Sequence, residues 1–287
     1  MRWRGRRQSG NVEDRRGQSY VGRSRGRKVG GGGTIILILI GLFFGQDISN
    51  ILAPLFSGPG NSGYQESARV ASGTTGSQND EAAQFVAVIL AETEDTWHPE
   101  FARLGKRYQA PTLVLYNDRV RSACGVSSAQ SGPFYCPGDF KVYIDLSFLN
   151  DLRNMGAPGD FAFAYVIAHE VGHHVQNLVG VAAQVRSQQA NSSQAQANAL
   201  SVRMELQADC LAGVWINHTE NRSSILEPGD IQEGLEAAAA VGDDRIFRQA
   251  GRAPRREAFT HGSSQERMQW FQQGVRSGNI ESCNTFS

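Results

Sequence analysis

Apolar residues recur with helical spacing along much of the chain after residue 79. The densest such pattern covers residues 161–180, where apolar side chains occupy nearly every position outside one short polar group. Asp160 can begin this helix as its N-cap, and Gly180 can end it. A helix of this composition is expected to lie inside a core with only one chemical edge open.

The same pattern predicts helices at about residues 80–97, 201–215, 230–240 and 265–277. Pro99 should end the first of these, whose acidic residues are expected to face outward: Glu81, Glu92, Glu94 and Asp95. Two short apolar or alternating runs, residues 112–116 and 141–145, predict strands. The expected fold class is therefore α+β, mainly helical with a small β-sheet.

The N-terminal part contains a dense apolar run at residues 34–44, within a stretch of uncharged residues from 29 to 46. This length reaches the lower limit for crossing a bilayer, which predicts a single N-terminal transmembrane helix. Arginines precede the run, so the N-terminus should lie in the cytoplasm, in a single-pass inner-membrane protein whose part after the run is periplasmic or extracellular. An uncleaved signal anchor is preferred, although the short apolar core leaves a cleaved signal peptide open.

Composition divides the chain into four expected parts. Residues 1–33 are an Arg- and Gly-rich head expected to be disordered, and 34–56 are the anchor and juxtamembrane segment. Residues 57–78 are a Gly/Ser-rich linker, and 79–287 form the main folded domain. Residues 1–46 carry ten Lys and Arg against two Asp and Glu, a charge of +8, so the rest of this formally neutral chain carries −8. A basic head could bind nucleic acid, but the apolar run favours a topology signal, and no nucleic-acid partner is expected.

The chemistry of the chain concentrates at residues 169–174, His-Glu-Val-Gly-His-His, which contain three of its six histidines. His169 and His173 lie four residues apart on one helical face, so both imidazoles can bind one Zn²⁺. Glu170 lies beside them and can reach a water at the metal, which is the position of a general base. His174 points away from the pair and is expected at the surface or behind the ligands.

A catalytic zinc takes three protein ligands and keeps a fourth position open. Glu205 and Asp209 share one face of the predicted helix 201–215, beside its apolar stripe. Glu205 is the expected third ligand, and Asp209 is expected to accept a hydrogen bond from a ligand histidine. A solvated acidic pair is the alternative interpretation.

These two motifs, H-E-x-G-H-H at 169–174 and E-L-Q-A-D-C-x-A-G-V-W at 205–215, resemble the neutral zinc metallopeptidases of membrane-anchored bacterial proteins over nearly the whole chain. The second motif is also similar to membrane gluzincins of the prenyl-protease and heat-shock-protease type. The resemblance implies a zincin-like fold with Glu205 as third ligand. Those gluzincins carry a downstream His followed six residues on by Arg, near the scissile carbonyl. His261 and Arg267 match this spacing, although Gly262 replaces the usual Pro, so His261 either stabilises the oxyanion or only packs.

The four cysteines have no C-x-x-C spacing, and their even number in a translocated domain indicates disulfides. The short loop between Cys124 and Cys136 favours a disulfide between these two, which leaves Cys210 to pair with Cys283. Other pairings remain open, as does a buried thiol at Cys210.

Together these features predict a zinc metalloendopeptidase that binds one Zn²⁺ per chain and cleaves a peptide or protein substrate, with Glu170 and His261 as catalytic residues. The strand at 141–145 is the candidate edge on which substrate aligns, although a structural hairpin fits it equally well. The alternative function is a membrane-anchored binding or scaffold protein with a structural or vestigial zinc site.

Overall fold

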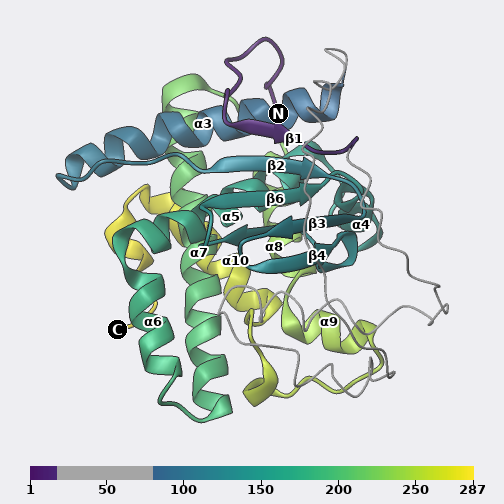
Figure 1. The fold of residues 1–287 in the computed structure, drawn as a ribbon, viewed down its shortest axis with the longest axis vertical. Coiled ribbons are helices and arrows are strands. Elements are labelled where there is room, and N and C mark those ends of the chain that lie inside the picture. Colours follow the sequence, from purple (N-terminus) through teal and green to yellow (C-terminus); the bar gives the residue numbers. More distant parts are fainter. Residues whose placement is uncertain (18–79) are drawn as a thin grey trace, which may run out of the picture.

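Helix α5 (Asp160–Val179) forms the centre of the fold in the computed structural model, which describes residues 1–17 and 80–287 (Figure 1). Every residue from Phe161 to Gln176 is buried, so most of α5 has no solvent face. Gly159 is the N-cap and Asp160 the first helical residue, so the helix begins one position earlier than predicted. Gly180 ends the helix, as predicted, with a φ of 91° that favours glycine.

Four helices enclose α5 and its neighbours. The long helix α7 (Gln194–Ser223), α8 (Asp230–Ala240) and α3 (Glu81–Arg103) pack against α5, while α10 (Ser264–Ser277) packs against α7 and α8. Helix α7 extends well beyond the predicted 201–215 because Ser193 and Gln196 form a capping box at its start. The metal-motif helix is therefore held on several sides at once.

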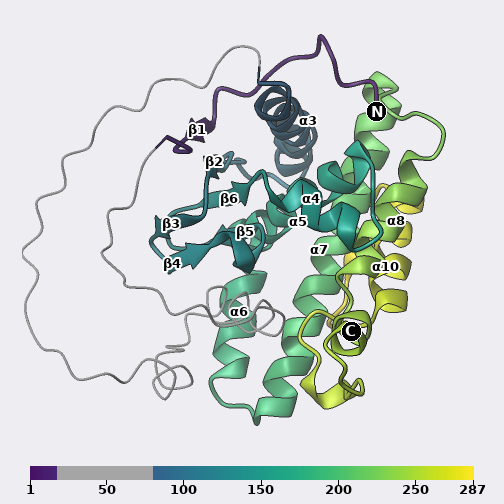
Figure 2. The same cartoon turned by 90° about the vertical axis from the view of Figure 1, so that its right-hand side faces the viewer.

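Three shorter helices complete the helical part within the described residues: α4 (Phe148–Asn154), α6 (Val181–Gln189) and α9 (Asp243–Gln249). Figure 2 shows α6 and α7 extending together as a helical hairpin away from the sheet. A short 3₁₀ turn follows α10 at Ile280–Cys283.

A four-stranded sheet has the order β1-β2-β6-β5, made of Val12–Asp14, Thr112–Tyr116, Lys141–Asp145 and Phe134–Cys136. The strands β2 and β6 have the predicted bounds but pair in parallel, which excludes a hairpin between them. The prediction that β6 is an edge strand is wrong, because β5 pairs antiparallel with its free side. A separate antiparallel pair, β3 (Arg119–Ser122) and β4 (Gly125–Ser128), lies beside this sheet.

Helix α3 corrects two expectations. It continues through Pro99 to Arg103, because Trp97 and Phe101 on either side of the proline are buried and hold the last turns in place. Glu92 and Glu94 are buried rather than outward-facing, since the N-terminal residues cover them. Asp80 caps the helix as expected, by accepting a hydrogen bond from the Ala83 amide.

The N-terminal head differs from its prediction where the structure describes it. Residues 1–17 are not disordered: β1 lies beside β2 and pairs with it in parallel (Figure 1). Met1 and Trp3 are buried. Residues 18–79, which include the expected anchor and linker, lie outside the described residues. Among the described helices, none has the length and apolar character needed to span a bilayer.

Two disulfides confirm the favoured pairing, Cys124 with Cys136 and Cys210 with Cys283. The second lies where α7 and α10 touch backbone to backbone. A Cβ atom on Gly274 of α10 would lie 1.9 Å from the Cys210 carbonyl oxygen, so only glycine allows this approach. The C-terminal segment is therefore fixed to α7 by close packing at Gly274 and covalently at Cys283.

Candidate metal centre

Helix α5 places the rings of His169 and His173 one turn apart, with centroids 4.7 Å from each other. The Nδ1 atom of His169 lies 2.8 Å from Asp209 Oδ1, and Nδ1 of His173 lies 2.8 Å from Gln176 Oε1. These partners fix both rings so that the Nε2 atoms face the same space.

Helix α7 brings Glu205 to that space. Its carboxylate oxygens lie 3.1 Å from His169 Nε2 and 3.4 Å from His173 Nε2. The two helices approach closely here because Gly172 has no side chain, and a Cβ atom on it would lie 3.0 Å from the Ala208 carbonyl oxygen. The glycine inside the motif therefore allows α7 to bring its carboxylate to the histidines.

The three side chains fit a zinc ion. Their ligand atoms all lie within 4.8 Å of one another, and two ligands on tetrahedral zinc are about 3.3 Å apart given metal–ligand bonds of about 2.0–2.1 Å. Although burial raises it, the neighbouring His173 and His169 lower the pKa of Glu205 well below its usual range, so this ligand is an anion. Two imidazoles and one carboxylate form a donor set typical of catalytic zinc.

Burial lowers the pKa of His169, but Asp209 and Glu205 outweigh it and raise the pKa to about 9. A metal that binds His169 must therefore displace a proton at neutral pH. A second acidic group, Asp160 with Asp230 and Glu233, differs because it contains only carboxylates and the Met1 ammonium lies 3.0 Å from Asp160.

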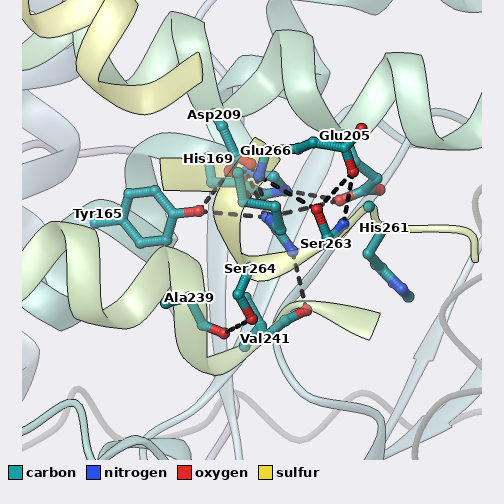
Figure 3. A network of polar contacts seen from close by, with 12 residues as sticks. Tyr165, His169, Glu205, Asp209, Ala239, Val241, His261, Ser263, Ser264 and Glu266 are labelled. Carbon is teal, nitrogen blue, oxygen red and sulfur yellow. Dashed lines mark hydrogen bonds and ion pairs between the residues drawn. The ribbon is translucent and has the colours of Figure 1, made fainter. Parts of the chain in front are cut away.

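Asp209 is completely buried and contacts three side chains behind the metal site. It accepts hydrogen bonds from Tyr165 and from the Arg267 guanidinium, whose Nε lies 2.8 Å from Oδ2, in addition to its contact with His169. Figure 3 shows the Tyr165 hydroxyl pointing toward His169 and Asp209. The guanidinium and the imidazole together lower the pKa of Asp209 despite its burial, so its charge is compensated.

A family model described as "Putative neutral zinc metallopeptidase" matches residues 1–286. The chain is a member of this zinc metallopeptidase family. It is 48% identical over 293 residues to the uncharacterized protein YpfJ of Escherichia coli K12, across 100% of this chain and 99% of that protein. It is 40% identical over 218 residues to the uncharacterized protein Rv2575 of Mycobacterium tuberculosis H37Rv, across 72% and 73% of the two chains. No solved structure matches.

Glu170 directly follows the ligand residue His169 on α5 and is buried. Burial raises the pKa of its carboxyl, while His173, His169 and a hydrogen bond from the Tyr135 backbone act in the opposite direction. The Tyr135 contact connects the residue expected to act as base to the edge strand β5. Sequence spacing gave no sign of this contact, because a three-residue strand shows no recognisable alternation.

His261 lies in the loop before α10 and pairs with a residue that the sequence analysis missed. Its Nδ1 lies 3.1 Å from Asp243 Oδ1, and the other Asp243 oxygen accepts the backbone N–H groups of Thr260, His261 and Gly262. Burial lowers the pKa of His261, but Asp243 and the more distant Glu205 raise it overall. The resemblance put Arg267 near the scissile carbonyl, whereas the structure places it behind His169, against Asp209.

Two further polar residues of α5 support the site from behind. Gln176 binds His173 and donates to the Met204 carbonyl of α7 at 2.7 Å, so it spans both ligand helices. Because residues three apart on a helix are neighbours, its position after His173 could have indicated this contact from the sequence. His174 is completely buried rather than at the surface: its Nε2–H donates to the Gln109 carbonyl at 2.6 Å, and its Nδ1 lies 3.0 Å from the Tyr135 hydroxyl.

Proposed function

We propose that this chain is a zinc metalloendopeptidase that hydrolyses peptide bonds in an extended peptide or protein substrate. The observation that carries the proposal is the convergence of His169, His173 and Glu205 from two helices, with the Glu170 carboxyl beside them. Zinc bound by these three residues would polarise the substrate carbonyl and lower the pKa of water toward neutrality.

Glu170 is the general base in this proposal. Its burial favours the neutral carboxyl and so raises its pKa, which suits a group that must both accept and release a proton near neutral pH. It takes the proton from the attacking water and passes it to the leaving amine. The Tyr135 backbone holds the carboxyl in place while this proton moves.

His261 is the proposed stabiliser of the negative charge that develops on the carbonyl oxygen. Asp243 fixes the ring through Nδ1 and raises its pKa, which leaves the opposite nitrogen as a donor. Arg267 has a different role from the one that the resemblance implied. It holds Asp209, and through Asp209 the ring of His169.

The substrate is proposed to lie along β5, the strand at the edge of the sheet beside α5. An extended peptide can add to such an edge by main-chain hydrogen bonds. The disulfide Cys124–Cys136 fixes this strand to the neighbouring β3–β4 hairpin, which would keep the edge at a constant distance from Glu170. The site would thus recognise backbone more than side chains.

The test combines metal content with digestion of a mixed peptide library by the purified full chain. Wild type should bind about one zinc per chain and cleave internal bonds, while Glu170→Gln should keep the zinc and lose cleavage by a factor of at least about 100. Glu281→Gln, which changes an exposed carboxylate in the same way, is the matched control and should retain both. Wild type that binds zinc without cleaving any peptide would instead indicate a binding or scaffold protein.

A further inference from the structure

The N-terminal head is bound to the catalytic domain along its whole described length. The Arg2 amide donates to the Ile225 carbonyl at 2.8 Å, and the Ser9 amide to the Ala87 carbonyl at 2.9 Å. Strand β1 then adds to β2, with Val12 opposite Leu113. Backbone hydrogen bonds at three separated points define one fixed path for residues 1–17.

Aromatic packing anchors this path in the main core. Trp3 is buried and meets Phe85 of α3 edge to face, with ring centroids 5.3 Å apart. Phe85 in turn stacks on Phe163 of the metal-motif helix at 6.1 Å. Burial of a tryptophan contributes a large share of the apolar area of any interface, so the head belongs to the same core as α5.

The arginines of the head pair with acidic residues, chiefly those of α3. Arg6 lies 3.2 Å from Glu92, and Arg7 lies 3.0 Å from Glu94 and 2.7 Å from Asp95. Further pairs join Arg4 to Glu81, Arg15 to Glu13 and Arg16 to both Asp14 and Asp80. The opposite charges of the head and the rest of the chain thus meet in specific contacts.

Glu94 shows how specific these contacts are. Besides its ion pair with Arg7, the Glu94 carboxylate accepts hydrogen bonds from the Ser9 hydroxyl at 2.5 Å and from the side-chain amide of Asn11 at 2.8 Å. Three residues of the head thus surround one buried carboxylate of α3. A buried charge needs such partners, so the head completes α3 rather than lying on it by chance.

The points where the chain leaves and re-enters the described part lie next to each other. Arg16 at the end of the head forms an ion pair with Asp80, the N-cap of α3. We propose that residues 1–17 and 80–287 fold as one unit and therefore lie on the same side of any membrane, contrary to the expected single-pass topology. In this arrangement the first arginines of the chain are docking residues for α3, not a signal that retains the head in the cytoplasm.

The experiment is cysteine labelling of the full chain in intact cells with a membrane-impermeant maleimide. The four native cysteines form disulfides, so each labelled variant carries one reactive thiol. Gln8→Cys reports the head and Gln188→Cys, on the exposed side of α6, reports the catalytic domain. Permeabilised cells give the full signal for each variant.

The thiols at positions 8 and 188 should behave alike: either both are labelled in intact cells, or both are labelled only after permeabilisation. Labelling of one position in intact cells with protection of the other would overturn the proposal. Because neither measurement uses peptide cleavage, failure here and failure of the proposed peptidase activity are distinguishable.

Stability gives a second, independent measurement on the purified full chain. Trp3→Ala should lower Tm by about 10 °C, and the milder Trp3→Phe should lower it less. Val126→Ala, at an exposed position, is the control and should stay within about 2 °C of wild type. A Trp3→Ala protein as stable as this control would show that the head is not docked.

Discussion

Replacement of Arg267 by Met tests how the C-terminal helix supports the metal centre. The Arg267 side chain is 3% exposed and Asp209 is 0% exposed, so the substitution leaves a buried carboxylate without its main counter-charge. Removal of one partner of a buried pair costs about 3–5 kcal/mol. Tyr165 and His169 still contact Asp209, which places the expected loss of unfolding free energy near about 3 kcal/mol.

Zinc affinity should fall together with stability. Asp209 orients His169 through Nδ1, and loss of such support beyond the ligands usually weakens metal binding by about 10–100-fold. Urea unfolding in the presence of a chelator measures the unfolding free energy. Competition with a coloured chelator measures the zinc affinity. The Asp209→Asn/Arg267→Met double variant should lose less stability than the sum of the single variants, because the uncompensated charge is gone.

Arg256→Met is the matched control, since Arg256 also pairs with a carboxylate, Glu266, but is 64% exposed. Its expected cost is at most about 1 kcal/mol, with zinc affinity unchanged. If Arg267→Met proved no more costly than this control and bound zinc as tightly as wild type, the assignment of Arg267 as a positioning residue would be wrong.

Three further outcomes follow from the described contacts. Gly274→Ala should destabilise by about 1–3 kcal/mol in urea unfolding, because the added methyl group forces α10 away from Cys210; Gly10→Ala, with no atom within 4 Å of its added Cβ, should not. Burial lowers the pKa of His174 to about 4, so its stabilisation is present above pH 6.5 and decreases as pH falls toward 4. Chelated wild type should therefore lose about 2 kcal/mol more between pH 7 and pH 5 than His174→Gln, and equal losses would contradict this. Chelation should abolish peptide cleavage yet leave the far-ultraviolet circular dichroism spectrum nearly unchanged, since the packing of buried apolar side chains holds α5 in the core.

The sequence predicted those features that depend on spacing within one element. The pair His169 and His173 needed only the helical repeat, and the strands 112–116 and 141–145 needed only short apolar runs flanked by turn residues. Glu205 and Asp209 followed because their helix had an apolar stripe that fixed which side faced the core. In each case the spacing of residues within one helix or strand was enough to predict the feature.

The features that the sequence analysis missed depend on partners far away along the chain. Arg7 pairs with Glu94, which lies more than eighty positions later in the chain. From composition alone, an arginine-rich segment is expected to be too polar to fold. Asp243 and His261 likewise come from a helix start and a loop that no periodicity connects. The edge strand β5 escaped notice because Phe134–Cys136 is too short to show alternation.

The C-terminal tail is part of the metal centre because it contacts α7 at consecutive positions. Arg267 of α10 holds Asp209, Gly274 lies against Cys210, and Cys283 is bonded to the same cysteine. These contacts fix α7 in both rotation and distance, and that determines where Glu205 points. The Arg267 and Gly274 contacts of α10 therefore support the part of α7 that carries Glu205, in addition to the close approach of α5 and α7 at Gly172.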